Sequence, residues 1–149
     1  MSSRLLASTY LGNKRLRWAA LGLILAGCAT GLGGDREHAM EEIGGAYKAI
    51  AGMAKAGSFE QAEVAEKANL IASELQHFGT LFPDGSEKAD GAANANIWTD
   101  RAGFDAARNA ARDAALELAS VTDAAAFPDA SKKLGDACGA CHSKYRAEY

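Results

Sequence analysis

Residues 64–82, VAEKANLIASELQHFGTLF, carry the pattern that decides the fold. Their apolar side chains recur at alternating intervals of four and three residues, at Val64, Ala68, Ile71, Leu75, Phe78 and Phe82. That interval places them on one face of an α-helix and leaves most charged residues on the other. The pattern therefore predicts an amphipathic helix that ends at Pro83 and has Ser58 as its N-cap.

The same interval recurs in three further segments of the chain. They cover about residues 35–56, 96–121 and 127–145, and Pro128 suits the first turn of the last one. Residues 83–95 lack the pattern and predict the longest loop. Four amphipathic helices with mostly short connections predict an all-α fold, an up-down-up-down antiparallel four-helix bundle.

The composition agrees with one helical domain. Of 149 residues, 48% are hydrophobic, so a sizeable core can form, and only two are proline. Alanine is frequent, whereas β-branched residues are scarce after residue 30, which favours helix over sheet. We therefore expect a folded all-α domain and not a disordered chain.

The first 27 residues have the form of an export signal. Basic residues at positions 14, 15 and 17 precede ten apolar residues, 18–27, a run too short to span a bilayer as a helix. We therefore expect residues 1–27 to be a signal peptide, residues 28–34 a flexible tether and residues 35–149 the helical domain. The mature protein is expected in the periplasm.

The end of this signal resembles a bacterial lipobox. Residues 25–28, Leu-Ala-Gly-Cys, match the four positions at which a peptidase cuts before a cysteine that carries diacylglycerol. Lipid on Cys28 would tether the protein to the membrane. The alternative is an ordinary signal peptide that is cut nearby, for instance after Ala29, with loss of Cys28.

The chemical signal is Cys138-Gly139-Ala140-Cys141-His142. C-x-x-C-H is the spacing of the attachment site for c-type haem, in which two thiols form thioethers with the haem vinyl groups and the histidine binds the iron. On a helix, Cys138 and Cys141 lie one turn apart on the same face, close enough to hold two edges of one porphyrin. The sequence therefore predicts one covalently attached haem c with His142 as an axial ligand.

Three other interpretations of the two cysteines fit less well. A thioredoxin-like C-x-x-C needs a βαβ context and a helix N-terminus that lowers the thiol pKa, and the helical pattern provides neither. A zinc site needs a fourth ligand and commonly a second cysteine pair. A disulfide within one helical turn has poor geometry and leaves His142 without a role.

The bundle topology selects a residue for the opposite side of the iron. The first helix is antiparallel to the last, so Met40 lies beside the end that carries His142. Met53 is thirteen residues further on, about 20 Å along the helix, and cannot reach the same haem. Met40 is the expected second ligand, although a core methionine would show the same pattern. His77 and His38 are weaker candidates, since neither lies on the apolar face of its helix.

The same end of the bundle supplies walls for the haem. Six apolar residues of the second and third helices fall there: Leu75, Phe78, Phe82, Ile97, Trp98 and Phe104. Arg36, Tyr145 and Arg146 also lie close in this arrangement, and the guanidinium fork suits the carboxylates of haem propionates. Ordinary core and solvated arginines would look the same in the sequence.

Together these residues resemble the class II cytochromes c, which include the high-spin cytochromes c′ and the low-spin cytochrome c-556 type. The resemblance covers about residues 35–149 and rests on four motifs: Arg36-x-x-x-Met40, Leu81-Phe82-Pro83, Ile97-Trp98-x-x-Arg101-x-x-Phe104 and Cys138-x-x-Cys141-His142-x-x-Tyr145-Arg146. It implies His142 as the proximal ligand, Arg36 near a haem propionate and Arg146 beside the proximal face. It also implies a homodimer through the first two helices, which is frequent in the family.

Position 40 separates two branches of that family. The cytochromes c′ place a non-ligating residue there and leave the iron open to NO or CO, whereas the low-spin branch uses methionine. Met40 thus implies an electron carrier with iron bound by His142 and Met40. The alternative is a gas-binding cytochrome c′ in which Met40 stays unbound. The motifs predict no enzyme, since no Ser/His/Asp set, phosphate loop or carboxylate pair accompanies them.

The charge of the mature chain restricts its partners. No acidic residue precedes Asp35, so removal of residues 1–27 leaves 12 basic against 19 acidic side chains, a formal charge of -7. An acidic domain of this kind is not expected to bind nucleic acid. Its surface favours a basic or membrane-bound redox protein as the partner.

Overall fold

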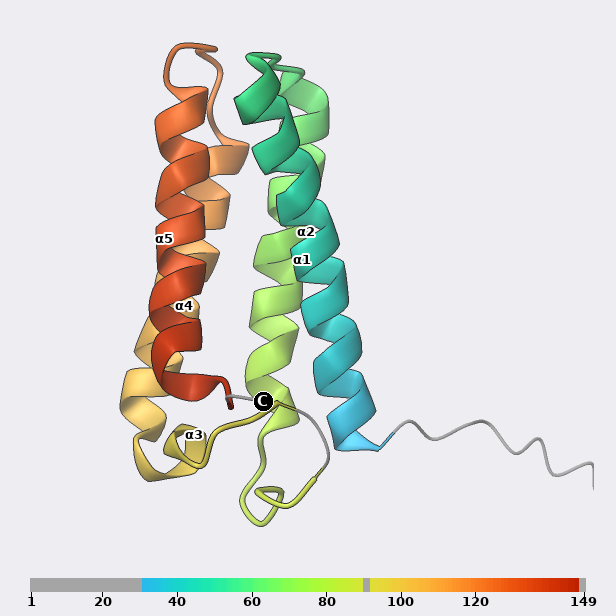
Figure 1. Cartoon of the computed structure of the whole chain (residues 1–149), viewed down its shortest axis with the longest axis vertical. Coiled ribbons are helices and arrows are strands. Elements are labelled where there is room, and N and C mark those ends of the chain that lie inside the picture. The colour runs from blue at the N-terminus through green and yellow to red at the C-terminus, as the bar shows by residue number, and fades with distance from the viewer. Residues whose placement is uncertain (1–30, 90–91, 148–149) are drawn as a thin grey trace, which may run out of the picture.

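The computed structural model describes residues 31–89 and 92–147, and the predicted four-helix bundle is confirmed (Figure 1). Four long helices lie side by side and alternate in direction, with a short 3-10 turn and a short helix between the second and third. The elements are α1 (Leu32–Ala56), α2 (Gln61–Phe78), η1 (Gly79–Leu81), α3 (Asn96–Thr99), α4 (Arg101–Ala119) and α5 (Phe127–Tyr145). Figure 1 places the start of α1, the loop after α2, α3 and the end of α5 at one end of the bundle.

Helix α1 begins earlier than the pattern predicts. It starts at Leu32 and not at Asp35, so residues 32–34 of the expected tether are helical, and Asp35 lies in the first turn, where its charge suits the helix dipole. The expected signal peptide and Cys28 lie outside the described residues. Within residues 31–89 and 92–147, no helix is long and apolar enough to cross a membrane.

The prediction that Ser58 is the N-cap of the second helix is wrong. The residue before α2 is Glu60, whose side chain makes no capping hydrogen bond. Ser58 belongs to the end of α1, where its hydroxyl and its backbone N–H both donate to the Met53 carbonyl. Gly57 makes this possible because its left-handed conformation, with φ of 68°, turns the chain back over the last carbonyls of α1.

The predicted third helix is split into α3 and α4. The break falls at Asp100, whose side chain accepts a hydrogen bond of 3.2 Å from the backbone N–H of Gly103. This is the geometry of an N-cap, so Asp100 begins a new helix. The short α3 thereby turns across the end of the bundle and brings Ile97 into the core.

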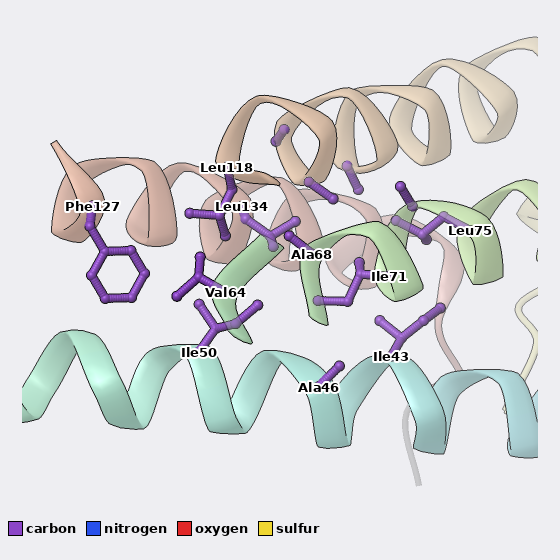
Figure 2. Packing of buried hydrophobic residues seen from close by; sticks show 14 residues of the cluster. Ile43, Ala46, Ile50, Val64, Ala68, Ile71, Leu75, Leu118, Phe127 and Leu134 are labelled. Carbon is purple, nitrogen blue, oxygen red and sulfur yellow. The ribbon is translucent and has the colours of Figure 1, made fainter. Parts of the chain in front are cut away.

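The core has two parts of different composition. Aliphatic and alanine side chains from α1, α2, α4 and α5 fill most of the length of the bundle (Figure 2), among them Ile50, Val64, Ile71, Leu118 and Leu134. We call this the aliphatic half. The other cluster, the aromatic end, consists of Ala39, Leu81, Phe82, Ile97, Phe104 and Tyr145.

The buried apolar stripe of α1 runs through Ala39, Ile43, Ala46 and Ile50. Ala39 and Ala46 face the core, whereas the neighbouring Met40 and Tyr47 are only partly buried. Small alanine side chains let α1 approach α2 closely, and the larger residues lie at the edge of the contact. Among the four long helices, α1 and α5 are the neighbours that pack least closely, and both line a cavity.

Candidate functional site

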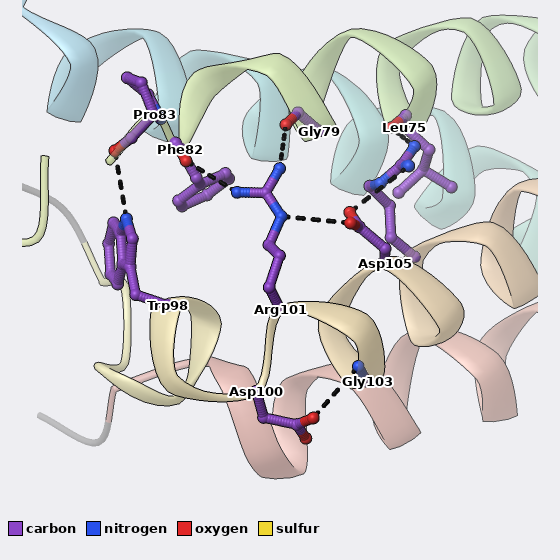
Figure 3. Close-up of polar contacts among 10 residues, drawn as sticks. Leu75, Gly79, Phe82, Pro83, Trp98, Asp100, Arg101, Gly103 and Asp105 are labelled. Atoms are coloured by element: carbon purple, nitrogen blue, oxygen red, sulfur yellow. Dashed lines mark hydrogen bonds and ion pairs between the residues drawn. The ribbon is translucent and has the colours of Figure 1, made fainter. Parts of the chain in front are cut away.

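A cavity of about 370 Å³ occupies the aromatic end and is enclosed by α1, α2, α4, α5 and the loop before α3. Exposed residues of α1 and of the end of α5 form its rim, namely Glu37, Glu41, His142 and Arg146. Of the six predicted walls, five line it: Leu75, Phe78, Phe82, Ile97 and Phe104. Trp98 stands behind Phe82, with ring centroids 5.8 Å apart, and donates from its indole to the Pro83 carbonyl (Figure 3).

One wall of this cavity carries the C-x-x-C-H motif. Cys138, Cys141 and His142 all line it from the last turns of α5, and both cysteines are free thiols that are partly buried. Burial raises the pKa of both thiols; at Cys141 the nearby Cys138 adds to the rise and the Arg108 cation opposes it. Raised values are the opposite of what a thioredoxin-like nucleophile requires.

Zinc is also a poor fit for this wall. Across residues 31–89 and 92–147, no group of three or more His, Cys, Asp or Glu could hold a metal ion. Partial burial and then the Arg146 cation lower the pKa of the His142 imidazole, which favours its neutral form. The neutral ring is the one that binds metals.

Met40 lines the same cavity from α1. The competing histidines do not: His38 and His77 are exposed on α1 and α2 and are not among the residues that line the cavity. Met53 packs against the aliphatic half, at the far end of α1. The structure therefore brings Met40 and His142 to one cavity and leaves the other candidates outside it.

Arg36 is buried in the cavity wall, with only 3% of its surface exposed. Its Nε donates to the Leu81 carbonyl at 3.0 Å, and its Nη2 donates to the carbonyl and hydroxyl of Ser86 at 3.2 and 2.8 Å. The guanidinium also lies over the Phe82 ring, 4.4 Å from its centroid. Nη1 is buried and has no hydrogen-bond partner within the described part of the chain, in a residue that lines the cavity.

Arg146 lies at the rim and is held by its backbone. Residues 92–94 and 145–147 pair as a short antiparallel bridge, in which the Asn94 N–H donates to the Tyr145 carbonyl and the Ala147 N–H to the Ala92 carbonyl, both at 3.0 Å. Ala92 and Ala93 thereby become part of the cavity wall. The bridge ties the long loop to the end of α5 next to His142.

One cavity residue of chemical interest, Arg108, was not predicted from the sequence. An arginine in an alanine-rich helix is typical of a solvent-exposed face, yet Arg108 is only 9% exposed and lines the cavity. A signal was present, because Arg108 lies four residues after Phe104 and three before Ala111, the spacing of the buried stripe of α4.

The cavity fits a haem c on its own residues. Two thiols and an imidazole line it from α5, a thioether lines it from α1, and its wall holds a buried guanidinium with an unpartnered nitrogen. This combination in a four-helix bundle defines a class of protein, the bundle cytochromes that bind haem through C-x-x-C-H.

Comparisons with known proteins identify the family. The model of the cytochrome C′ family matches residues 34–146, so this chain belongs to that family of haem c proteins. It is 38% identical over 130 residues to cytochrome c-556 of Agrobacterium fabrum, which covers 84% of this chain and 88% of that protein. It is 38% identical over 90 residues to cytochrome c′ of Rhodospirillum rubrum, or 58% of this chain and 61% of that one. The solved structure of cytochrome c′ from Rhodopseudomonas palustris is similar, with a TM-score of 0.72, 30% identity and coverage of 80% of this chain and 98% of that one.

Proposed function

We propose that this protein carries single electrons between redox partners in the periplasm, with haem joined to Cys138 and Cys141 and its iron bound by His142 and Met40. The observation that supports this is the single cavity that all four residues line from two facing helices. When bound, haem c supplies a one-electron Fe(III)/Fe(II) couple. The protein holds the iron in one place, shields it from water and sets the charge around it.

The pairing of Met40 with His142 matters for the potential. Thioether sulfur opposite an imidazole is a ligand pair that raises the reduction potential of a c-type haem. Met40 is partly buried on the side of α1 that faces α5, and its flexible side chain can extend across the cavity. A ligand at that position also closes the iron to small gases, which favours electron transfer over gas binding.

The two arginines of the α1 and α5 walls have separate roles in this proposal. The free Nη1 of Arg36 binds a haem propionate, and the bonds to Leu81 and Ser86 hold the guanidinium in position for it. Arg146 lies beside His142 and favours its neutral form. Burial lowers the pKa of the Arg36 guanidinium below its ordinary range, and a carboxylate partner would offset that cost of burial.

The surroundings of the cavity suggest how partners approach. Glu37 and Glu41 stand exposed on the α1 side of the rim, and the mature chain is acidic, which favours a basic redox protein that docks there. The outer surface of α1 and α2 remains the proposed homodimer face. Lipid on Cys28 would restrict this exchange to partners at the membrane.

The first test is the optical spectrum of the holoprotein, oxidised and reduced, before and after addition of CO. Narrow, split low-spin bands in the reduced form that CO does not shift are the expected result, because Met40 occupies the sixth position. A broad high-spin reduced spectrum that changes promptly with CO would overturn the proposal and assign an open, gas-binding iron, as in the alternative function.

A matched pair of variants assigns the ligand. Met40→Leu is expected to convert the spectrum to high spin and to open the iron to CO. Met53→Leu, in the same helix and also partly buried, is expected to leave the spectrum unchanged, because Met53 is not among the residues that line the cavity. A low-spin spectrum that survives Met40→Leu would show that another residue binds the iron.

A further inference from the structure

Arg108 is a buried cation at the inner wall of the haem cavity. Its side chain is 11% exposed, its Nη1 donates to the Leu75 carbonyl at 3.0 Å, and its Nη2 lies 3.7 Å from a carboxylate oxygen of Asp105. Its Nε is buried and has no hydrogen-bond partner among the residues described. Neither the haem attachment nor the axial ligation uses this residue.

The Arg108 guanidinium occupies space that is open because residue 79 is a glycine. A Cβ on Gly79 would lie 2.8 Å from both Cζ and Nε of Arg108, closer than real Cβ contacts allow. The guanidinium therefore lies against the backbone where α2 passes into η1, and the Leu75 carbonyl holds it there. A charge held in this way cannot move out to solvent when the charge of the haem changes.

The charge of Arg108 is only partly neutralised. Asp105 is its ion-pair partner, but the same carboxylate also accepts from Nε of Arg101 at 3.2 Å, so one negative charge serves two guanidinium groups. Arg101 and Asp105 have 41% and 37% of their side chains exposed, and water screens their charges. The buried member of the group is Arg108, and a net positive charge remains at the cavity wall.

We propose that Arg108 raises the reduction potential of the haem by placing this buried positive charge at the wall of its cavity. Reduction adds one electron to the iron and so removes one positive charge from the haem. A fixed cation nearby repels the oxidised form more than the reduced form, and low dielectric strengthens that repulsion. Arg108 is thus a tuning residue that acts without touching the iron. The inference rests on the proposed haem attachment and not on the identity of the second axial ligand.

If Arg108 had only a structural role, we would expect a different result. Arg108 also binds a carbonyl at the end of α2, so its loss could act by loosening that helix end. Arg101 binds the same region through the carbonyls of Gly79 and Phe82, at 3.0 and 2.7 Å, but it does not line the cavity (Figure 3). Arg101→Gln therefore serves as the matched control for lost hydrogen bonds without lost cavity charge.

The test is a spectroelectrochemical titration of the holoproteins. Arg108→Gln is expected to shift the reduction equilibrium toward the oxidised form by about tenfold, which is about 59 mV lower for a one-electron couple. Arg108→Lys keeps the charge and is expected to retain most of the potential. Arg101→Gln is expected to change the equilibrium by less than about threefold. An unchanged potential in Arg108→Gln, or an equal fall in Arg101→Gln, would overturn the proposal.

A variant of opposite sign covers the case in which Arg108→Gln yields no holoprotein. Asp105→Asn removes the partial neutralisation and leaves Arg108 in place, so the potential is expected to rise, by less than Arg108→Gln lowers it. A lower or unchanged potential in Asp105→Asn would contradict the electrostatic role, since loosening of the helix end gives no reason for a rise. The optical spectrum of each variant reports separately on haem attachment and ligation, so their failure is distinguishable from failure of the charge effect.

Discussion

The aliphatic half of this bundle is built from the four long helices, whereas the aromatic end also takes residues from η1, the loop after it and α3, and the two regions serve different purposes. In the aliphatic half, Ile50, Ile71, Leu118 and Leu134 are completely buried and fill the space between the helices. At the aromatic end, rings and arginines surround a cavity, and Arg36 and Arg108 are as buried as ordinary core residues.

The difference shows how one fold separates stability from function. Dense aliphatic packing supplies free energy of folding without polar groups to satisfy. The aromatic end buries guanidinium groups with unpaired N–H donors, which is costly for a protein alone and acceptable where a cofactor completes the site. We therefore expect changes in the two regions to be measured by different experiments.

The largest effect is expected from loss of the attachment residues. Cys138→Ser with Cys141→Ser removes both thioether bonds, so covalent haem, detected by haem staining after denaturing electrophoresis, should disappear completely. Without bound haem the cavity loses its filling, and amide hydrogens of the aromatic end should exchange faster while those of the aliphatic half stay protected. Loss of protection throughout the bundle would contradict this division.

Gly139→Ala is the control for that experiment. Gly139 lies between the two cysteines in the sequence, is exposed, and a Cβ there would meet nothing within 4 Å. The variant is expected to retain its covalent haem in full. Loss of haem staining in Gly139→Ala would show that any change within the motif prevents attachment, even when both cysteines are present.

A smaller effect, on stability alone, is expected in the aliphatic half. Leu134→Ala should lower the free energy of unfolding by about 2–5 kcal/mol, because the fully buried side chain would leave an apolar cavity. Denaturant unfolding measures the loss, and the optical spectrum should stay unchanged. Leu116→Ala, at a leucine of α4 that is 47% exposed, should cost less than about 0.5 kcal/mol. Equal losses in the two variants would refute the assignment of Leu134 to the packed core.

The smallest effect is a pH dependence at the aromatic end. Hydrogen bonds from Lys144, then from Tyr145 and the Gly103 backbone, lower the pKa of Asp100 from its ordinary range. A lowered pKa in the folded state stabilises the protein above the unfolded value, near 3.9, and that contribution is lost as pH falls through the folded value. Asp100→Asn should therefore lower Tm by a few degrees at pH 7, and the gap to the parent protein should narrow as the pH falls below about 4.

Thermal unfolding of both proteins between pH 7 and pH 3 measures that gap. Asp113→Asn is the control on the same helix, since Asp113 is 63% exposed and pairs with its neighbour Arg112, a contact that contributes little. A gap for Asp100→Asn that stays constant or widens toward pH 3 would contradict the assigned role of the Asp100 carboxylate.

The bundle could be predicted from sequence because its signals are local. The repeating interval of apolar residues in 64–82 and the loop after Pro83 each depend on a few neighbouring residues. The attachment motif is equally local. Topology then brought Met40 to the same end as His142, since antiparallel helices of similar length match start to end.

The missed features depend on contacts between distant segments. The break at Asp100 depends on its side chain, which caps α4 and meets Lys144 and Tyr145 of α5. The burial of Arg108 depends on which face of α4 meets α2 and on the space left at Gly79. The pattern within one helix identifies the interval of a buried face. Whether a charged residue on that face is buried depends on hydrogen-bond and ion-pair partners in another helix, which that pattern does not contain.

The bridge between residues 92–94 and 145–147 also has a consequence for the order in which the molecule can be completed. A ribosome delivers residues 145–147 after Cys138 and His142, whereas residues 92–94 emerge much earlier. Residues 92–94 therefore cannot pair until residues 145–147 have been synthesised. The part of the cavity wall that Ala92 and Ala93 provide cannot form before the attachment cysteines have been synthesised. Closure of this end therefore requires residues 145–147 and comes after the synthesis of both attachment cysteines.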